Sequence, residues 1–159
     1  MSHQLIPFIR SSTAIADWCS AHGVRLVSDE IYHGVTYGTG PDAKGVCARE
    51  VDEHAIVVSS FSKYWGMTGW RLGWLLVPQD LRAAVDALAG NIALCPPAAA
   101  QEAAVAAFSE ESYRQCEAAL VDFGRARQVL LDRVPELGWG AAAPADGAFY
   151  YWADLGDQL

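Results

Sequence analysis

Three short apolar runs, each followed at once by polar or turn-forming residues, constrain the fold of this chain more than any other feature. The runs cover 24–28, 55–58 and 72–77 and are rich in Val, Leu and Ile. Short runs of this kind are typical of buried strands, whereas surface helices show a longer three-four periodicity. Helical segments separate and follow the runs, which predicts an α/β fold with a mostly parallel sheet.

Periodicity and end signals predict the remaining elements. We expect helices at 11–22, 80–88, 98–108 and 110–134, strands within 139–155 and a loop at 34–45. Ser11 or Ser12 is expected to cap the first helix and Gly23 to end it, and Pro135 is expected to end the last helix. The sequence of residues 1–10 is ambiguous and predicts neither a helix nor a strand.

Charge and cysteine usage exclude several classes of partner. The formal net charge is −8, so the chain repels nucleic acid and anionic lipid, and neither is an expected partner. No segment has the ~20 uninterrupted apolar residues of a membrane span, and residues 1–10 lack a signal-peptide pattern. The four cysteines form no Cys-x-x-Cys pair and have no zinc-like spacing to histidine. We therefore expect reduced thiols, no metal site and a cytoplasmic location.

Polar side chains follow the second strand. Ser60, Ser62 and Lys63 come directly after the run 55–58, and Arg71 lies eight residues beyond the lysine. Ligands of parallel α/β sheets bind where strands end, and hydroxyls with a guanidinium are suitable donors for a phosphate. The lysine adds an amine that can act as a nucleophile or a base.

A carboxylate and a phenol follow the first strand. Asp29 could pair with a protonated ring nitrogen, and Tyr32, three residues on, could donate a hydrogen bond to a phenolate oxygen. An amine, an acid, a phenolic donor and an anion cradle together match the groups of pyridoxal 5'-phosphate (PLP), an aldehyde-bearing pyridine with a phosphate arm.

The segment Ser-Phe-Ser-Lys-Tyr-Trp-Gly-Met-Thr-Gly-Trp-Arg-Leu-Gly at 60–73 closely resembles the signature of class I/II aminotransferases. Val-Ser-Asp-Glu-Ile-Tyr at 27–32 resembles the pyridine-binding strand end of that family. Gly-Ala-Phe-Tyr at 147–150 is similar to its first small-domain strands. The resemblance implies the fold-type-I architecture of PLP-dependent transferases, a homodimer, and amino-acid and 2-oxo-acid substrates.

The resemblance also implies a role for each site residue. Lys63 would bind the cofactor aldehyde and move a proton between the substrate Cα and the cofactor. Asp29 would keep the pyridine nitrogen protonated, and Tyr32 would donate to O3′. The phosphate would be held by Ser60 and Arg71, with help from Ser62.

The chain lacks several features that the family has on either side of these motifs. No Gly- or Ser-rich phosphate turn, stacking aromatic residue or Asn-Pro-x-Gly motif precedes Asp29, and no carboxylate-binding arginine follows the final motif. We therefore expect a central piece of a longer fold, with residues 1–115 in a partial PLP-binding large domain and 116–159 in a partial small domain.

Other functions remain open at this point. A carbon–sulfur β-lyase or a cyclopropane-forming synthase can use the same fold, although β-lyase relatives more often have His at the position of Tyr32. The chain could also be a non-catalytic piece that needs complementary segments. A nucleotide-binding domain is disfavoured because the chain has no Gly-x-x-x-x-Gly-Lys-Ser/Thr motif. The absence of Lys and Arg between Arg82 and Arg114 argues against an anchor for an acidic substrate side chain.

Overall fold

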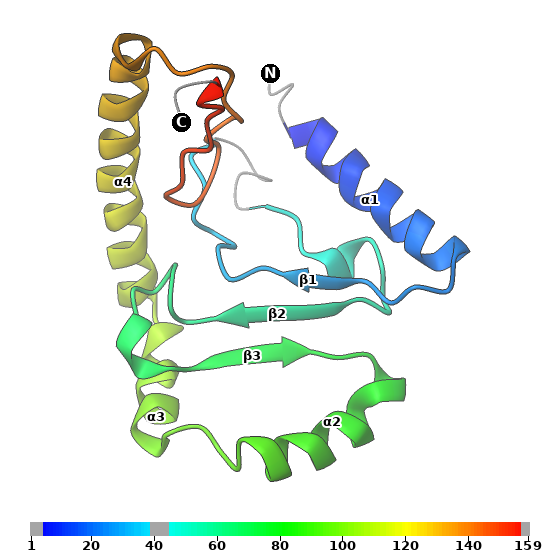
Figure 1. Ribbon diagram of the computed structural model, residues 1–159. Coiled ribbons are helices and arrows are strands. Elements are labelled where there is room, and N and C mark those ends of the chain that lie inside the picture. Colours follow the sequence, from blue (N-terminus) through cyan, green and yellow to red (C-terminus); the bar gives the residue numbers. More distant parts are fainter. Residues whose placement is uncertain (1–4, 39–44, 157–159) are drawn as a thin grey trace.

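A three-stranded sheet forms the centre of the computed structural model, which describes residues 5–38 and 45–156 (Figure 1). β1 (Val27–Asp29) pairs in parallel with β2 (Ile56–Ser60), and β2 pairs antiparallel with β3 (Gly73–Leu76). The prediction of a partial α/β fold is confirmed, and the described part of the sheet is mixed.

Helices make up most of the rest. The described residues form α1 (Leu5–Ala21), α2 (Gln79–Ile92), α3 (Ala98–Ala107) and α4 (Glu110–Leu137), with short 3-10 helices η1 (Ala48–Glu50) and η2 (Thr68–Trp70) in the loops. Figure 1 shows the long helix α4 on one side of the sheet and α1 on the other. In the part of the chain that the structure describes, no helix combines the length and apolar character needed to cross a bilayer.

Two predicted helix ends are wrong. α1 begins at Leu5, so positions 11 and 12 lie inside the helix and not at its start. α4 continues through Pro135 to Leu137, and Gly138, which follows it, has a left-handed backbone (φ 65°). Pro135 lies in the final turn, where few helical residues follow it, and the left-handed glycine turns the chain away from the helix axis.

The strands expected within 139–155 are also wrong. The described residues of this segment make only two isolated pairings, Thr36 with Gly147 and Ala142 with Ala153. A strand needs a continuous hydrogen-bonded neighbour, and each of these pairings stops after one residue pair. The expected domain boundary near residue 115 falls inside α4 and remains a proposal.

Two small hydrophobic clusters fix the loops around the sheet. The larger cluster consists of Phe61, Leu72, Ala100, Ala104 and Ala107, and the smaller one of Ala48, Ala55 and Val57. The three alanines of the larger cluster recur at three- and four-residue spacing, so they share one face of α3. Their short side chains let the loop that follows β2 lie close against the helix, and this loop carries Lys63.

Candidate functional site

The ends of β1 and β2 bring a carboxylate and a hydroxyl to one face of the sheet. Asp29 is the partner of Val58 in the parallel ladder, and residues paired in this way have side chains on the same face. Ser60 lies two residues beyond Val58 and so faces the same side. The Glu30 N–H donates to the Val58 carbonyl (2.8 Å), which holds the turn after β1 against β2.

Gly73 keeps this face open where β3 approaches. It lies directly opposite Ser60 in the antiparallel ladder. A Cβ on Gly73 would be 2.6 Å from the Ser59 carbonyl oxygen and 3.3 Å from the Ser60 Cβ. A side chain at this position would push the two strands apart, so the close approach of β2 and β3 requires glycine.

One cavity collects four of the six predicted site residues. It has a volume of about 440 Å³ and is lined by Ile31, Ser60, Ser62, Lys63, Thr68, Arg71, Leu72 and Gly73. The polar lining therefore consists of an amine, a guanidinium and hydroxyls, without a carboxylate. Ser60 Oγ accepts a hydrogen bond from the Ser62 N–H (3.2 Å), which tightens the turn after β2. This set of donors fits an anion such as a phosphate group.

Arg71 has a constrained backbone. Its φ of 53° lies in the left-handed region, which costs a residue with a Cβ on the order of 1–2 kcal/mol. Such conformations persist where the surroundings impose them, and they concentrate at functional sites. One guanidinium nitrogen, Nη1, donates to the Thr68 carbonyl (2.8 Å), so the side chain is held at the cavity by its own preceding turn.

Lys63 lies against two aromatic rings. Its Nζ is 5.3 Å from the ring centre of Tyr32 and 5.5 Å from that of Phe149, a distance at which an ammonium group is attracted to a ring face. The turn that carries Tyr32 includes Gly34, which has a φ of 87°. A Cβ on Gly34 would be 2.8 Å from the ring of Tyr64. The turn after β1 thus packs directly on the neighbour of Lys63.

Two further contacts fix the loop on either side of the lysine. The indole Nε1 of Trp65 donates to the Ala107 carbonyl at the end of α3 (2.8 Å), and the Tyr64 hydroxyl donates to Glu117 of α4 (2.7 Å). Burial, together with the Glu117 carboxylate, raises the pKa of Tyr64, so this phenol stays a hydrogen-bond donor at neutral pH. The Lys63 loop is therefore attached to both helices.

Asp29 lies in a second cavity, of about 350 Å³, whose lining also includes Tyr32. Its Oδ1 accepts a hydrogen bond from the Ile31 N–H (3.2 Å). The structure thus brings Ser60, Ser62, Lys63 and Arg71 to one cavity, and Tyr32 to Lys63. Asp29 does not line the cavity that contains Lys63. Tyr32 connects the two cavities, because it lines the one that contains Asp29 and lies beside Lys63.

The sequence analysis did not predict that residues of the segment 147–150 contact Lys63 and Tyr32. Phe149 contacts the lysine, and the hydroxyl of Tyr150 is hydrogen-bonded to that of Tyr32, 118 positions earlier in the chain. The Gly-Ala-Phe-Tyr motif was the available signal, but it predicted only strand structure. A contact over this separation has no local signature in the sequence.

Comparison with known proteins identifies the class to which this fold and site belong. The family model for aminotransferases of class I and II matches residues 10–158, and the chain belongs to this family. The resemblance of the Lys63 segment to the family signature is thereby confirmed. PLP is the general cofactor of the family, and amino acids and 2-oxo acids are its general substrates.

Individual relatives cover most of this chain. The valine–pyruvate aminotransferase of Mycobacterium tuberculosis is 51% identical over 144 residues, which are 91% of this chain and 37% of that protein. The (5-formylfuran-3-yl)methyl phosphate transaminase of Methanocaldococcus jannaschii is 33% identical over 136 residues, 84% of this chain and 35% of that protein. The crystal structure of an aminotransferase from Mycobacterium tuberculosis matches with a TM-score of 0.84 and 50% identity, covering 90% of this chain and 36% of that one. The chain thus spans less than two-fifths of the length of these relatives, in agreement with the expected partial fold.

Proposed function

We propose that this protein binds PLP through Lys63 and takes part in the transfer of an amino group between an amino acid and a 2-oxo acid. The observation that carries the proposal is the cavity in which the amine of Lys63 shares its walls with Arg71 and the hydroxyls of Ser60 and Ser62. The lack of a carboxylate in this lining supports binding of an anionic group, and the amine of Lys63 can react with an aldehyde that this group carries.

The phosphate would be held by Ser60, Ser62 and Arg71. Arg71 uses Nη1 for the Thr68 carbonyl, which leaves its other guanidinium donors for phosphate oxygens. The absence of a side chain at Gly73 supports this assignment, because a Cβ there would crowd the Ser60 side of the cavity.

The remaining residues would act on the ring and on the substrate. Bound PLP supplies an electron sink for charge that develops at the substrate Cα. Lys63 would bind the aldehyde, and its amine would be the group that accepts the proton from the substrate Cα. Asp29 would keep a proton on the ring nitrogen, and the Tyr32 hydroxyl would donate to O3′. The position of Tyr32 beside Lys63 supports this arrangement.

We propose a small apolar amino acid such as valine as amino donor and pyruvate as acceptor. Two observations support this choice: the 51% identity to a valine–pyruvate aminotransferase, and the absence of Lys and Arg between Arg82 and Arg114. We further propose a homodimer, as in the family, and a cytoplasmic location. All four cysteines lie in the described residues and none forms a disulfide, as is usual in a reducing compartment.

The test is a single-turnover reaction with valine, with aspartate as the comparison, of the PLP-loaded chain completed by the segments of the aminotransferase fold that its relatives have on either side of the matched region. Amino-group transfer predicts that valine converts the cofactor to its amine form with release of the 2-oxo acid, and that aspartate reacts much more slowly. Release of pyruvate and ammonia from a β-substituted amino acid, without conversion by valine, would instead identify a β-lyase.

A further inference from the structure

The segment 145–150 crosses the Lys63 site and delivers two aromatic residues to it. The rings of Phe149 and Tyr150 both meet the Tyr32 ring edge-on, each with a centroid distance of 5.3 Å. The hydroxyl of Tyr150 is also hydrogen-bonded to the hydroxyl of Tyr32. Tyr32 is therefore in contact both with Lys63 and with this segment.

The direction of the hydroxyl contact has a chemical consequence. A phenol hydroxyl can donate one hydrogen bond and accept others. Either hydroxyl of this pair can donate, and the contact raises the pKa of Tyr150. In the arrangement in which Tyr150 donates, the hydrogen of Tyr32 is available for a third group.

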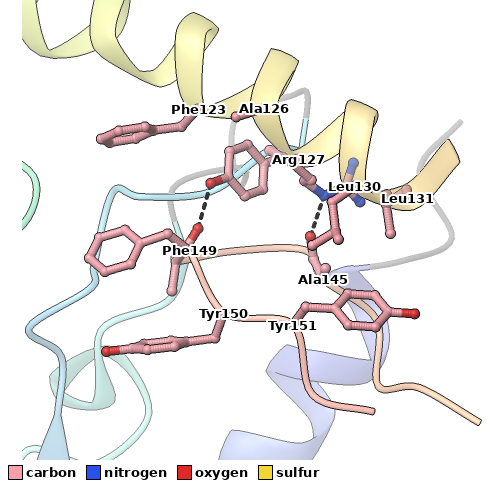
Figure 2. Close-up of a pocket in the computed structure, with 11 residues that line it drawn as sticks. Phe123, Ala126, Arg127, Leu130, Leu131, Ala145, Phe149, Tyr150 and Tyr151 are labelled. Atoms are coloured by element: carbon pink, nitrogen blue, oxygen red, sulfur yellow. Dashed lines mark hydrogen bonds between the residues drawn. The ribbon is translucent and has the colours of Figure 1, made fainter. Parts of the chain in front are cut away.

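A clamp formed by Arg127 and Tyr37 holds the segment in place. Arg127 Nε donates to the Ala145 carbonyl (Figure 2). The Tyr37 hydroxyl donates to the Ala148 carbonyl. The guanidinium also lies 5.3 Å from the centre of the Tyr37 ring, and the Tyr37 N–H donates to the Asp146 carbonyl (3.0 Å). The clamp borders a cavity of about 200 Å³ between α4 and the segment.

We propose that Tyr150 is a positioning residue of the Lys63 site. Its hydroxyl orients the Tyr32 hydroxyl toward the phenolate oxygen of the cofactor, and Arg127 keeps Tyr150 in place through the segment 145–150. The inference rests on the proposed PLP function, because the partner of Tyr32 is a group of that cofactor.

The expected effect is on the protonation of the bound cofactor. A hydrogen bond from Tyr32 to the phenolate oxygen would stabilise the deprotonated form of the Lys63-bound cofactor and so would lower its pKa. Tyr32 donates more strongly while it accepts from Tyr150, because linked hydrogen bonds polarise one another. Loss of the Tyr150 hydroxyl should therefore raise the apparent pKa of the chromophore.

Other titratable groups around Tyr32 and Lys63 are unchanged by this substitution. They are Asp29, the Glu30–His33 pair (3.4 Å), Arg71, and Tyr64 with its partner Glu117. Tyr151 provides a matched control, since its ring points away from that of Tyr150 and lies 6.0 Å from Trp139 (Figure 2).

The experiment is a pH titration of the absorbance of PLP-loaded protein. Tyr150→Phe should raise the apparent pKa of the chromophore by roughly 0.2–0.6, whereas Tyr151→Phe should titrate like wild type. Arg127→Met should shift the pKa in the same direction. The double variant of Arg127→Met and Tyr150→Phe should shift no further than the larger single effect, because Arg127 acts through Tyr150.

The possible results separate this inference from the proposed function. If wild type carries PLP on Lys63 and Tyr150→Phe titrates like wild type, the positioning role is wrong while the proposed function stands. Additive shifts in the double variant would contradict the action of Arg127 through Tyr150. If wild type does not bind PLP at Lys63, the proposed function is wrong and this inference falls with it.

Discussion

Arg71 is one of three non-glycine residues with a left-handed backbone among the described residues, and it lines the cavity that contains Lys63. Its left-handed backbone would be as costly for a lysine as for an arginine, because both have a Cβ. A substitution between the two therefore changes the head group and leaves the backbone cost the same. Arg71 thus offers a direct test of whether the cavity binds a phosphate group.

We predict that Arg71→Lys weakens PLP binding about 10- to 100-fold, because a planar two-pronged donor is replaced by a single ammonium. The dissociation constant can be measured by titration of PLP absorbance. Arg82→Lys, on α2 and outside the cavity lining, is the matched control and should bind like wild type. Equal affinities for the Arg71 and Arg82 variants would contradict the phosphate assignment.

The predictability of the site residues depends on how far apart they lie in the chain. Ser60, Lys63 and Arg71 fall within one loop, so their spacing alone predicts that they meet. Tyr32 and Lys63 are neighbours because β1, which precedes Tyr32, pairs with β2, which precedes Lys63. The strand pattern predicted a sheet in which these strands are adjacent. The contact of Tyr150 with Tyr32 depends on α4 and on the clamp at Arg127, and nothing local in the sequence specifies it.

At the scale of the elements, the β2–β3 ladder determines the shape of the cavity. β2 continues into Ser59 and Ser60, beyond the apolar run that predicted it, because these residues pair with Trp74 and Gly73. The polar character of the two serines suggested a strand end, and only the neighbouring strand explains why the strand continues. In the same way, 139–155 has strand-like residues but lacks a continuous partner in the described structure.

Gly73→Ala should destabilise the fold by about 1–3 kcal/mol, because the new Cβ meets the Ser59 carbonyl and the backbone must shift. The same shift should weaken PLP binding, and denaturant unfolding together with PLP titration measures both effects. Gly69→Ala is the control within the same motif, since a Cβ there meets nothing within 4 Å. Similar stabilities of the two variants would show that the strands tolerate a side chain at Gly73.

At the scale of the whole molecule, the chain exposes more surface than its mass predicts. A folded monomer of 17.1 kDa is expected to expose about 7,800 Å², whereas this chain exposes 11148 Å². Large apolar side chains are among the exposed residues, and Ile92 and Leu94 at the end of α2 are 79% and 82% exposed. Apolar surface of this extent is typical of faces that other protein covers.

We therefore predict that the 159-residue chain, produced by itself, is marginally stable and has little or no transaminase activity. It should bind a hydrophobic dye, self-associate in size-exclusion chromatography and melt over a broad temperature range. A sharp cooperative melt of a monomer, together with measurable turnover, would contradict this prediction.

The central claim is that the amine of Lys63 binds the aldehyde of PLP. Borohydride reduction of a PLP-treated sample, followed by peptide mapping, tests it most directly, because the chain has only two lysines, Lys44 and Lys63. We predict a pyridoxyl group on the peptide that contains Lys63 and none on the peptide that contains Lys44. A modified Lys44 with an unmodified Lys63, or no pyridoxyl group at all, would contradict the assignment of this site.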